Sequence, residues 1–262
     1  MINKNLNIYK LLKHCLVMIK IVDRFILVGS SHVAKNSLAE IEEAIEKFMP
    51  EVVCLELDHV RFKKLMTSNV DKKPTSSDIL KSIKEFGAFG FLFANIAGYV
   101  QGKIGKKLGV KPGVDMKTGY LKARELKIPV SLIDQNIKVT LKNLSKLSFF
   151  KKISLFGGMF FKGMKKENRE LLNFDLKKVP SERVVSKMVD ILKKESPLLY
   201  DILIEGRNRY MVKRLLKLRE LHEGYILAIV GAGHVRGMVD LLDKELVCDT
   251  KGLNVSYSFS VE

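Results

Sequence analysis

The stretch RFILVGSSHV, residues Arg24–Val33, joins an apolar, β-branched run to a glycine turn and then to a histidine, His32. The same pattern returns near the other end of the chain as LAIVGAGHV, residues Leu227–Val235, which delivers His234. An apolar run of this kind predicts a buried strand, and the glycine after it lets the backbone turn sharply. Because open α/β sheets bind ligands beyond the carboxyl ends of their strands, the two Gly-x-x-His segments predict a site built from both ends of the chain.

Two further apolar runs predict buried strands. EVVCLELD, residues Glu51–Asp58, carries Glu56 near its end, and IPVSLID, residues Ile128–Asp134, ends on a second carboxylate. Helix signals separate these strands, among them a capping box at Ser37–Glu40. Strands that alternate with helices form parallel pairs. The sequence therefore predicts an α/β fold with a mainly parallel central sheet flanked by helices.

The domain organisation follows from composition. We expect residues 1–17 to be an N-terminal extension and residues 18–262 to form a single α/β domain. Within it, residues 79–107 form an apolar helical segment and residues 145–200 an α-helical insertion, which could cap the site or pair subunits. The apolar part Phe86–Val100 fits a core hairpin, or else an element that touches a membrane or a second subunit. It is short for a transmembrane helix.

The charge balance bounds the partners. The chain has 46 basic and 29 acidic side chains, a net charge of +17. This suits a lysine-coated thermophilic protein, or one that meets an anionic membrane surface. The lysines are spread along the chain and no nucleic-acid motif appears, so we expect no specific nucleic-acid partner. Three scattered cysteines, with Cys54 as core packing, favour a reducing compartment and a cytoplasmic location, with membrane association as the alternative.

The strand ends predict a metal site. His32, Glu56, Asp134 and His234 should share one edge of the sheet, because parallel strands end together. Two imidazoles and a carboxylate form a facial ligand set for a divalent metal, so we predict His32, Glu56 and His234 as its ligands. These donors suit Mn, Co, Fe or Zn, and the identity of the metal stays open.

Other residues have predicted roles around that metal. Glu56 could act at the metal or as a base, Arg207 could hold a carboxylate or an oxyanion, and Asn208 could add a neutral hydrogen bond. Arg61 and Asp134 are candidate substrate contacts. Each also has a structural alternative. A strand-end glutamate can pair with an arginine inside the fold, Asp134 can form a cap or turn, and Arg207 and Asn208 can be ordinary helix positions.

Several motifs follow one another over roughly residues 20–245. They are Gly29–Val33, Cys54–Asp58 with Arg61, Leu108–Gly113, Asp115-Met116, Leu132–Asp134 with Thr140-Leu141, Arg207–Met211, and Val230–Val235 with Gly237-Met238. In this order they resemble the TraB/PrgY (pheromone shutdown) family, which is related to the Tiki membrane proteases and to the ChaN and erythromycin-esterase-like proteins.

The resemblance implies an archaeal member with an EreA/ChaN-like α/β core. It further implies metal-dependent hydrolysis, as in the Tiki branch, or reduced activity of secreted peptide pheromones, as in the pheromone branch. Archaeal relatives usually continue into C-terminal transmembrane helices. The chain departs from the family where Gln135-Asn136 replace the more usual Arg-Asp, and where Gly206 replaces an acidic residue.

Two classes of function follow. The first is a metal-dependent hydrolase that acts on a peptide or another small molecule. The second is a non-catalytic regulatory protein that binds a peptide or ligand in the same pocket at the membrane surface. A homodimer is compatible with both.

Overall fold

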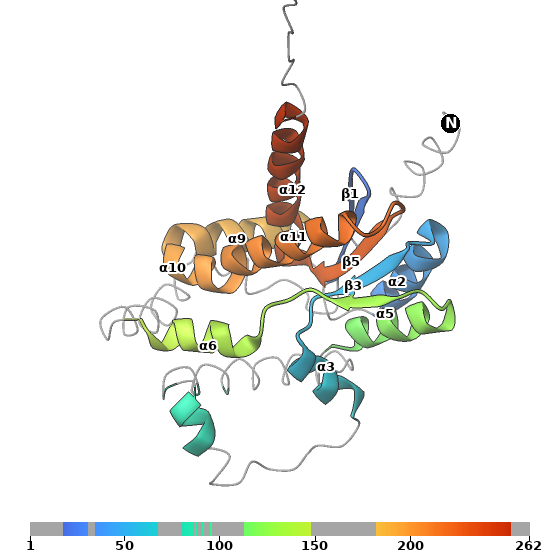
Figure 1. Ribbon diagram of the computed structural model, residues 1–262. Coiled ribbons are helices and arrows are strands. Elements are labelled where there is room, and N and C mark those ends of the chain that lie inside the picture. The colour runs from blue at the N-terminus through green and yellow to red at the C-terminus, as the bar shows by residue number, and fades with distance from the viewer. Residues whose placement is uncertain are drawn as a thin grey trace, which may run out of the picture.

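The computed structural model describes residues 18–30, 35–67, 80–85, 87, 91, 95, 113–147 and 182–252. Its centre is a five-stranded sheet in the order β1-β2-β5-β3-β4 (Figure 1). The strands are β1 (Met18–Val22), β2 (Phe25–Ser30), β3 (Val52–Leu55), β4 (Val130–Leu132) and β5 (Ile226–Gly231). β1 pairs with β2 in the antiparallel sense, and the other pairings are parallel. The mainly parallel sheet of an α/β fold is thus confirmed.

The two Gly-x-x-His strands are direct neighbours. β2 and β5 run parallel in a register that pairs Phe25 with Ile226 and Ser30 with Gly231. β5 also pairs with β3, so it lies at the middle of the sheet. The carboxyl ends of these strands therefore meet at one edge. His32, which follows β2, lies outside the described residues.

Helices cover both faces of the sheet, which makes three layers (Figure 1). Along β2 the side chains alternate, so that Phe25 and Leu27 pack on one face and Ile26 and Val28 on the other. The first face is covered by α11 (Gly206–Arg219) and α12 (Ala232–Gly252), and the second by α2 (Lys35–Phe48) and α5 (Val114–Glu125). Burial on both faces explains why these strands are continuous apolar runs.

The remaining helices lie at the site end of the sheet. They are α3 (His59–Met66), α6 (Ile137–Ser145), α9 (Glu182–Glu195), α10 (Pro197–Tyr200) and the π-helical turn η1 (Asp201–Glu205). A separate apolar cluster joins α6 to α10 and η1 through Leu144, Leu199 and Ile202. This contact fixes where α11, which follows η1 directly, begins.

The predicted helical segments are described only in part. In the insertion 145–200, residues 182–195 and 197–200 are helical, and residues 148–181 lie outside the described residues. In the apolar segment 79–107, residues 80–85, 87, 91 and 95 are helical. The rest of that segment and the extension 1–17 lie outside the described residues. Among the described residues no helix is long and apolar enough to cross a membrane.

Two local features concern the start of α2 and the glycine that follows η1. The helix expected to start at the Ser37 capping box begins earlier, at Lys35. In η1 the backbone N–H of Gly206 donates to the carbonyl of Asp201, and a Cβ at position 206 would lie 2.9 Å from that oxygen. The π turn therefore favours a glycine at position 206. Such turns occur often at functional sites, and this one immediately precedes Arg207.

Candidate functional site

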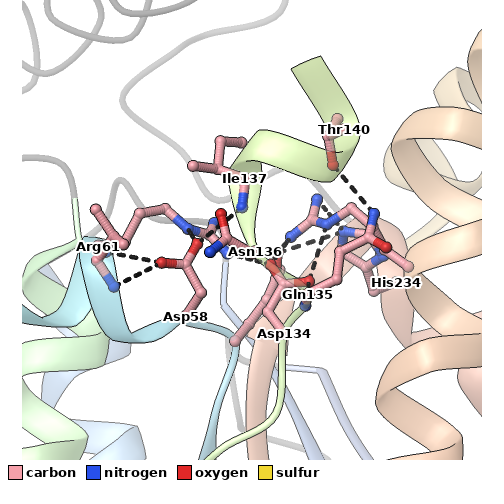
Figure 2. Close-up of polar contacts among 12 residues, drawn as sticks. Asp58, Arg61, Asp134, Gln135, Asn136, Ile137, Thr140 and His234 are labelled. Atoms are coloured by element: carbon pink, nitrogen blue, oxygen red, sulfur yellow. Dashed lines mark hydrogen bonds and ion pairs between the residues drawn. The ribbon is translucent and has the colours of Figure 1, made fainter. Parts of the chain in front are cut away.

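The polar side chains at the carboxyl edge come from three strand ends and one helix. Glu56 directly follows β3, Asp134 lies just beyond β4, and His234 stands in the first turn of α12, after β5. Arg207 and Asn208 open α11, whose N-terminal end lies against the same edge. Figure 2 shows Asp134 and His234 converging with their neighbours in this region.

Arg207 lies at the centre of the group. Its Nη2 donates to Glu56 Oε1 and to Asp134 Oδ2 at 2.6 Å, and its Nε donates to Asp134 Oδ1 at 3.2 Å. The guanidinium thus donates two parallel hydrogen bonds to the Asp134 carboxylate, a geometry that arginine forms and lysine does not. Burial opposes the positive charge, but the Glu56 and Asp134 carboxylates outweigh it and raise the pKa of Arg207. The arginine is therefore a permanent cation.

The protonation of His234 follows from its neighbours. Its Nε2 lies 3.1 Å from Arg207 Nη1, and its Nδ1 lies 2.7 Å from Asn208 Oδ1. A guanidinium can only donate, so the contact between Arg207 and His234 is a hydrogen bond in the tautomer that leaves Nε2 without a proton. The proton is therefore assigned to Nδ1, which donates to the Asn208 carbonyl oxygen. This tautomer turns the Nε2 lone pair of a buried imidazole toward the cluster.

Glu56 is held by the backbone of β5. Its Oε2 accepts a hydrogen bond from the Gly231 N–H at 2.6 Å, and its Oε1 lies 3.4 Å from His234 Nε2. The side chain is 8% exposed. A carboxylate tied to a central strand has little freedom to move, so its position relative to His234 is fixed by the sheet.

Asp58 and Arg61 extend the network beyond Asp134. Asp58 caps α3, with Oδ1 accepting from the N–H groups of Val60 and Arg61 at 2.8 and 2.9 Å. Its Oδ2 accepts from Arg61 Nε at 2.8 Å and from the Ile137 N–H at 3.1 Å, and Arg61 Nη2 donates to Asp134 (Figure 2).

These contacts shift the pKa values of Asp58 and Arg61 so that both groups stay charged. Burial opposes ionisation of Asp58, but hydrogen bonds from Arg61 and from the Ile137 backbone outweigh it, so the pKa of Asp58 falls below its ordinary value. Burial likewise opposes the charge of Arg61, and Asp134 and Asp58 outweigh it and raise the pKa of Arg61. Both groups are therefore ionised at neutral pH.

The predicted residues other than His32 meet in one network. Arg207 contacts both Glu56 and His234. Asn208 contacts the other ring nitrogen of His234, Nδ1. Arg61 and Asp134, predicted as substrate contacts, bind each other, and Asp134 also binds Arg207. Sequence reasoning missed the role of Asp58. Its signal was an aspartate directly before a helix with an arginine three positions on.

Glu56 and His234 are the described residues that were predicted as ligands of a divalent metal. No cluster of three or more His, Cys, Asp or Glu side chains suited to a metal occurs among the described residues, which exclude His32. Glu56 Oε1 and an unprotonated His234 Nε2 nevertheless lie 3.4 Å apart, and both atom types are ordinary ligands. The network has a formal charge of −1, which favours a bound cation. Its groups are the carboxylates of Glu56, Asp58 and Asp134 and the guanidinium groups of Arg61 and Arg207. Arg207 contacts both Glu56 Oε1 and His234 Nε2 in the structure, so an ion would bind them only in place of these two contacts, with Arg207 still held by Asp134.

The comparisons with known proteins place the chain in a family. The model of the TraB/PrgY/gumN family matches residues 18–245. An uncharacterized protein of Methanocaldococcus jannaschii is 36% identical over 222 residues, which cover 83% of this chain and 53% of that protein. TraB domain-containing proteins of mouse and human are each 23% identical over 238 residues, covering 82% of this chain and 61% of theirs.

The chain belongs to the TraB/PrgY/gumN family. The resemblance found in the sequence motifs is thereby confirmed. The chain spans 53% to 61% of the length of these relatives.

Proposed function

We propose that this protein hydrolyses peptides with the help of a divalent metal ion at the carboxyl edge of its sheet. One observation carries the proposal: a fixed Glu56 carboxylate stands 3.4 Å from the unprotonated Nε2 of His234. Asn208 orients the imidazole through Nδ1, as outer-shell partners do for metal-bound histidines. His32 completes the ligand set. Mn, Co, Fe and Zn all suit these donors.

The residues then have separate tasks. Glu56 and His234 would hold the metal in place of their contacts with Arg207, which would keep its two bonds to Asp134. Arg207 Nη1, which also donates to the Leu203 carbonyl at 3.3 Å, would then donate to the oxygen on which negative charge develops during hydrolysis. Glu56 accepts the proton of the attacking water. The metal, when bound, polarises the scissile carbonyl and makes water more acidic.

Glu56→Gln tests this division of tasks. The substitution nearly preserves shape and leaves an oxygen to accept from Gly231, but it removes the base. Hydrolysis of a responsive peptide, followed by mass spectrometry with each metal added in turn, should fall by about a hundredfold or more. Glu223→Gln is the matched control, because the Glu223 side chain is almost fully exposed, and it should leave the rate unchanged. An unchanged rate in Glu56→Gln would contradict the mechanism.

A second candidate function is non-catalytic binding of a peptide or small ligand. One observation favours it: Arg207 already contacts Glu56, Asp134 and His234, so the network is internally paired. A binding protein would retain a peptide without cleaving it, and mass spectrometry of the same reactions separates the two outcomes. If the protein also acts at a membrane surface, its +17 charge should make binding to anionic vesicles fall away at high salt.

A further inference from the structure

A cavity lies against Asn208, and His234 is not among its lining residues. It has a volume of about 80 Å³ and is enclosed by α9, the α10–η1 region, the start of α11 and the first turns of α12. Asn208, Gly233 and Gly237 form its inner wall, and Lys193 and Arg236 stand among its lining residues. Glu56, Arg207 and His234 do not line it, so the cavity is separate from the cluster described above.

The inner wall carries a buried donor with nothing to donate to. Asn208 is fully buried, and its Nδ2 has no hydrogen-bond partner among the described residues. The amide points toward Gly237, whose missing side chain makes room for it, since a Cβ there would overlap Nδ2. A buried N–H without a partner is costly, so such a group calls for an explanation.

Turning the amide over would not remove this donor. Arg207 Nη1 requires a bare Nε2 on His234, so the Nδ1 proton of His234 must point at the Asn208 carbonyl oxygen. A flipped amide would set two donors against each other. The network on one side of Asn208 therefore fixes Nδ2 toward the cavity on the other side.

The start of α12 favours a negatively charged oxygen. Ala232 and Gly233, the first residues of α12, line the cavity, and N–H groups in the first turn of a helix lack partners within the helix. The positive end of the helix dipole points the same way. Lys193 and Arg236 line the cavity together with Asp190 and Asp240, so these four side chains add no net charge, and Arg236 lies 3.5 Å from Asp190. Val185 and Val189 supply an apolar side.

We propose that this cavity binds a carboxylate group, with one oxygen accepting from Asn208 Nδ2 and the group facing the start of α12. The volume suits a few heavy atoms and excludes a whole peptide. Two sources share this chemistry: a free small carboxylic acid and the C-terminal carboxylate of a peptide. The proposal concerns binding alone and holds whether or not the Glu56 site hydrolyses peptides.

Nuclear magnetic resonance of ¹⁵N-labelled full-length protein tests the proposal directly. The side-chain NH₂ signals of Asn208 are followed while acetate, N-acetylalanine or N-acetylalanine amide is added at constant ionic strength. Both carboxylates should shift these signals in a saturable way, and the neutral amide should not. Tighter binding of N-acetylalanine points to a peptide end as the source, and equal or tighter binding of acetate to a free acid. No saturable shift with either carboxylate, or an equal shift with the amide, overturns the proposal.

Gly233→Ala tests the location without threatening the fold. The new methyl group would enter the cavity, where the nearest atom is Val189 Cγ2 at an ordinary contact distance of 3.6 Å. Acetate affinity should fall about tenfold or more as the cavity shrinks. Met188→Ala is the control, since Met188 lies on the same α9 helix as Val189, is 47% exposed and does not line the cavity. Unchanged affinity in Gly233→Ala would place the carboxylate elsewhere.

Discussion

At the scale of single residues, Arg207 decides how the other groups are protonated and oriented. Its guanidinium binds the carboxylates of Glu56 and Asp134 and contacts Nε2 of His234. The other ring nitrogen of His234 in turn contacts Asn208. Sequence reasoning selected Arg207 and Asn208 because they sit together in a helix motif. It could not give the chain of contacts, because the order of donors and acceptors depends on distances between residues far apart in sequence.

Arg207→Lys should weaken the fold even though it keeps the charge. An ammonium cannot reproduce the paired bonds to Asp134 together with the contact to Glu56, so the free energy of unfolding should drop by about 2 kcal/mol or more. Arg209→Lys on the same helix is the matched control, because Arg209 is exposed and pairs with Asp201 at 2.7 Å. It should change stability by no more than about 0.5 kcal/mol. Equal losses in urea unfolding of the two variants would contradict the role given to Arg207.

Asp58→Asn should change how stability depends on pH. The pKa of Asp58 is lowered in the folded state from 3.8, so its ionised form stabilises the fold above about pH 4, and this contribution disappears as the pH falls through the lowered value. The variant should therefore be less stable than wild type at pH 7, and the gap should narrow in acid. Urea unfolding from pH 7 to pH 2.5 measures it. Asp201→Asn, at an exposed surface pair, is the control and should show a small gap throughout. A gap for Asp58→Asn that stays constant with pH would count against this contribution.

At the scale of elements, the apolar runs predicted the strands well, because burial on both faces leaves a continuous signal. β5 lies at Ile226–Gly231, in the apolar run that precedes His234, and Cys54 is buried in β3 as predicted. Burial also raises the pKa of the Cys54 thiol, which makes it unreactive. The π turn η1 escaped prediction, since its register depends on tertiary contacts and not on a local pattern.

The packing of α5 on the sheet gives a test at this scale. A Cβ at Gly119 would overlap Ile229 Cδ1, so Gly119→Ala should destabilise the fold by about 1 to 3 kcal/mol although alanine favours helices. Ile229→Val removes the offending methyl group. It should cost about 0.5 to 1.5 kcal/mol alone, yet it should restore stability when added to Gly119→Ala. Simple additivity of the two losses in thermal or urea unfolding would show that the contact is not the cause.

At the scale of the whole molecule, the site is assembled from both ends of the chain. β2 and β5 pair side by side, and the strand ends carry Glu56 and His234 to one edge together with Arg207. The alternation of strands and helices predicted that Glu56, Asp134 and His234 would meet at one edge, whereas the part of His32 stays a prediction because it lies outside the described residues. The bond from Arg61 to Asp134 was not predictable, because it joins α3 to the end of β4, whereas the Asp58–Arg61 pair lies within the start of one helix.

The central claim is that this edge holds one divalent metal ion. Isothermal titration of the metal-free protein with Mn²⁺ and Zn²⁺ tests it most directly, with His32→Ala, Glu56→Gln and His234→Ala as variants and His222→Ala as the control away from the site. His222 pairs with Glu51 and contacts neither Glu56 nor His234 in the described interactions. We predict one ion per chain in wild type and in His222→Ala, and binding at least about tenfold weaker in the three site variants. No binding to wild type, or equal binding in all the variants, would contradict the account.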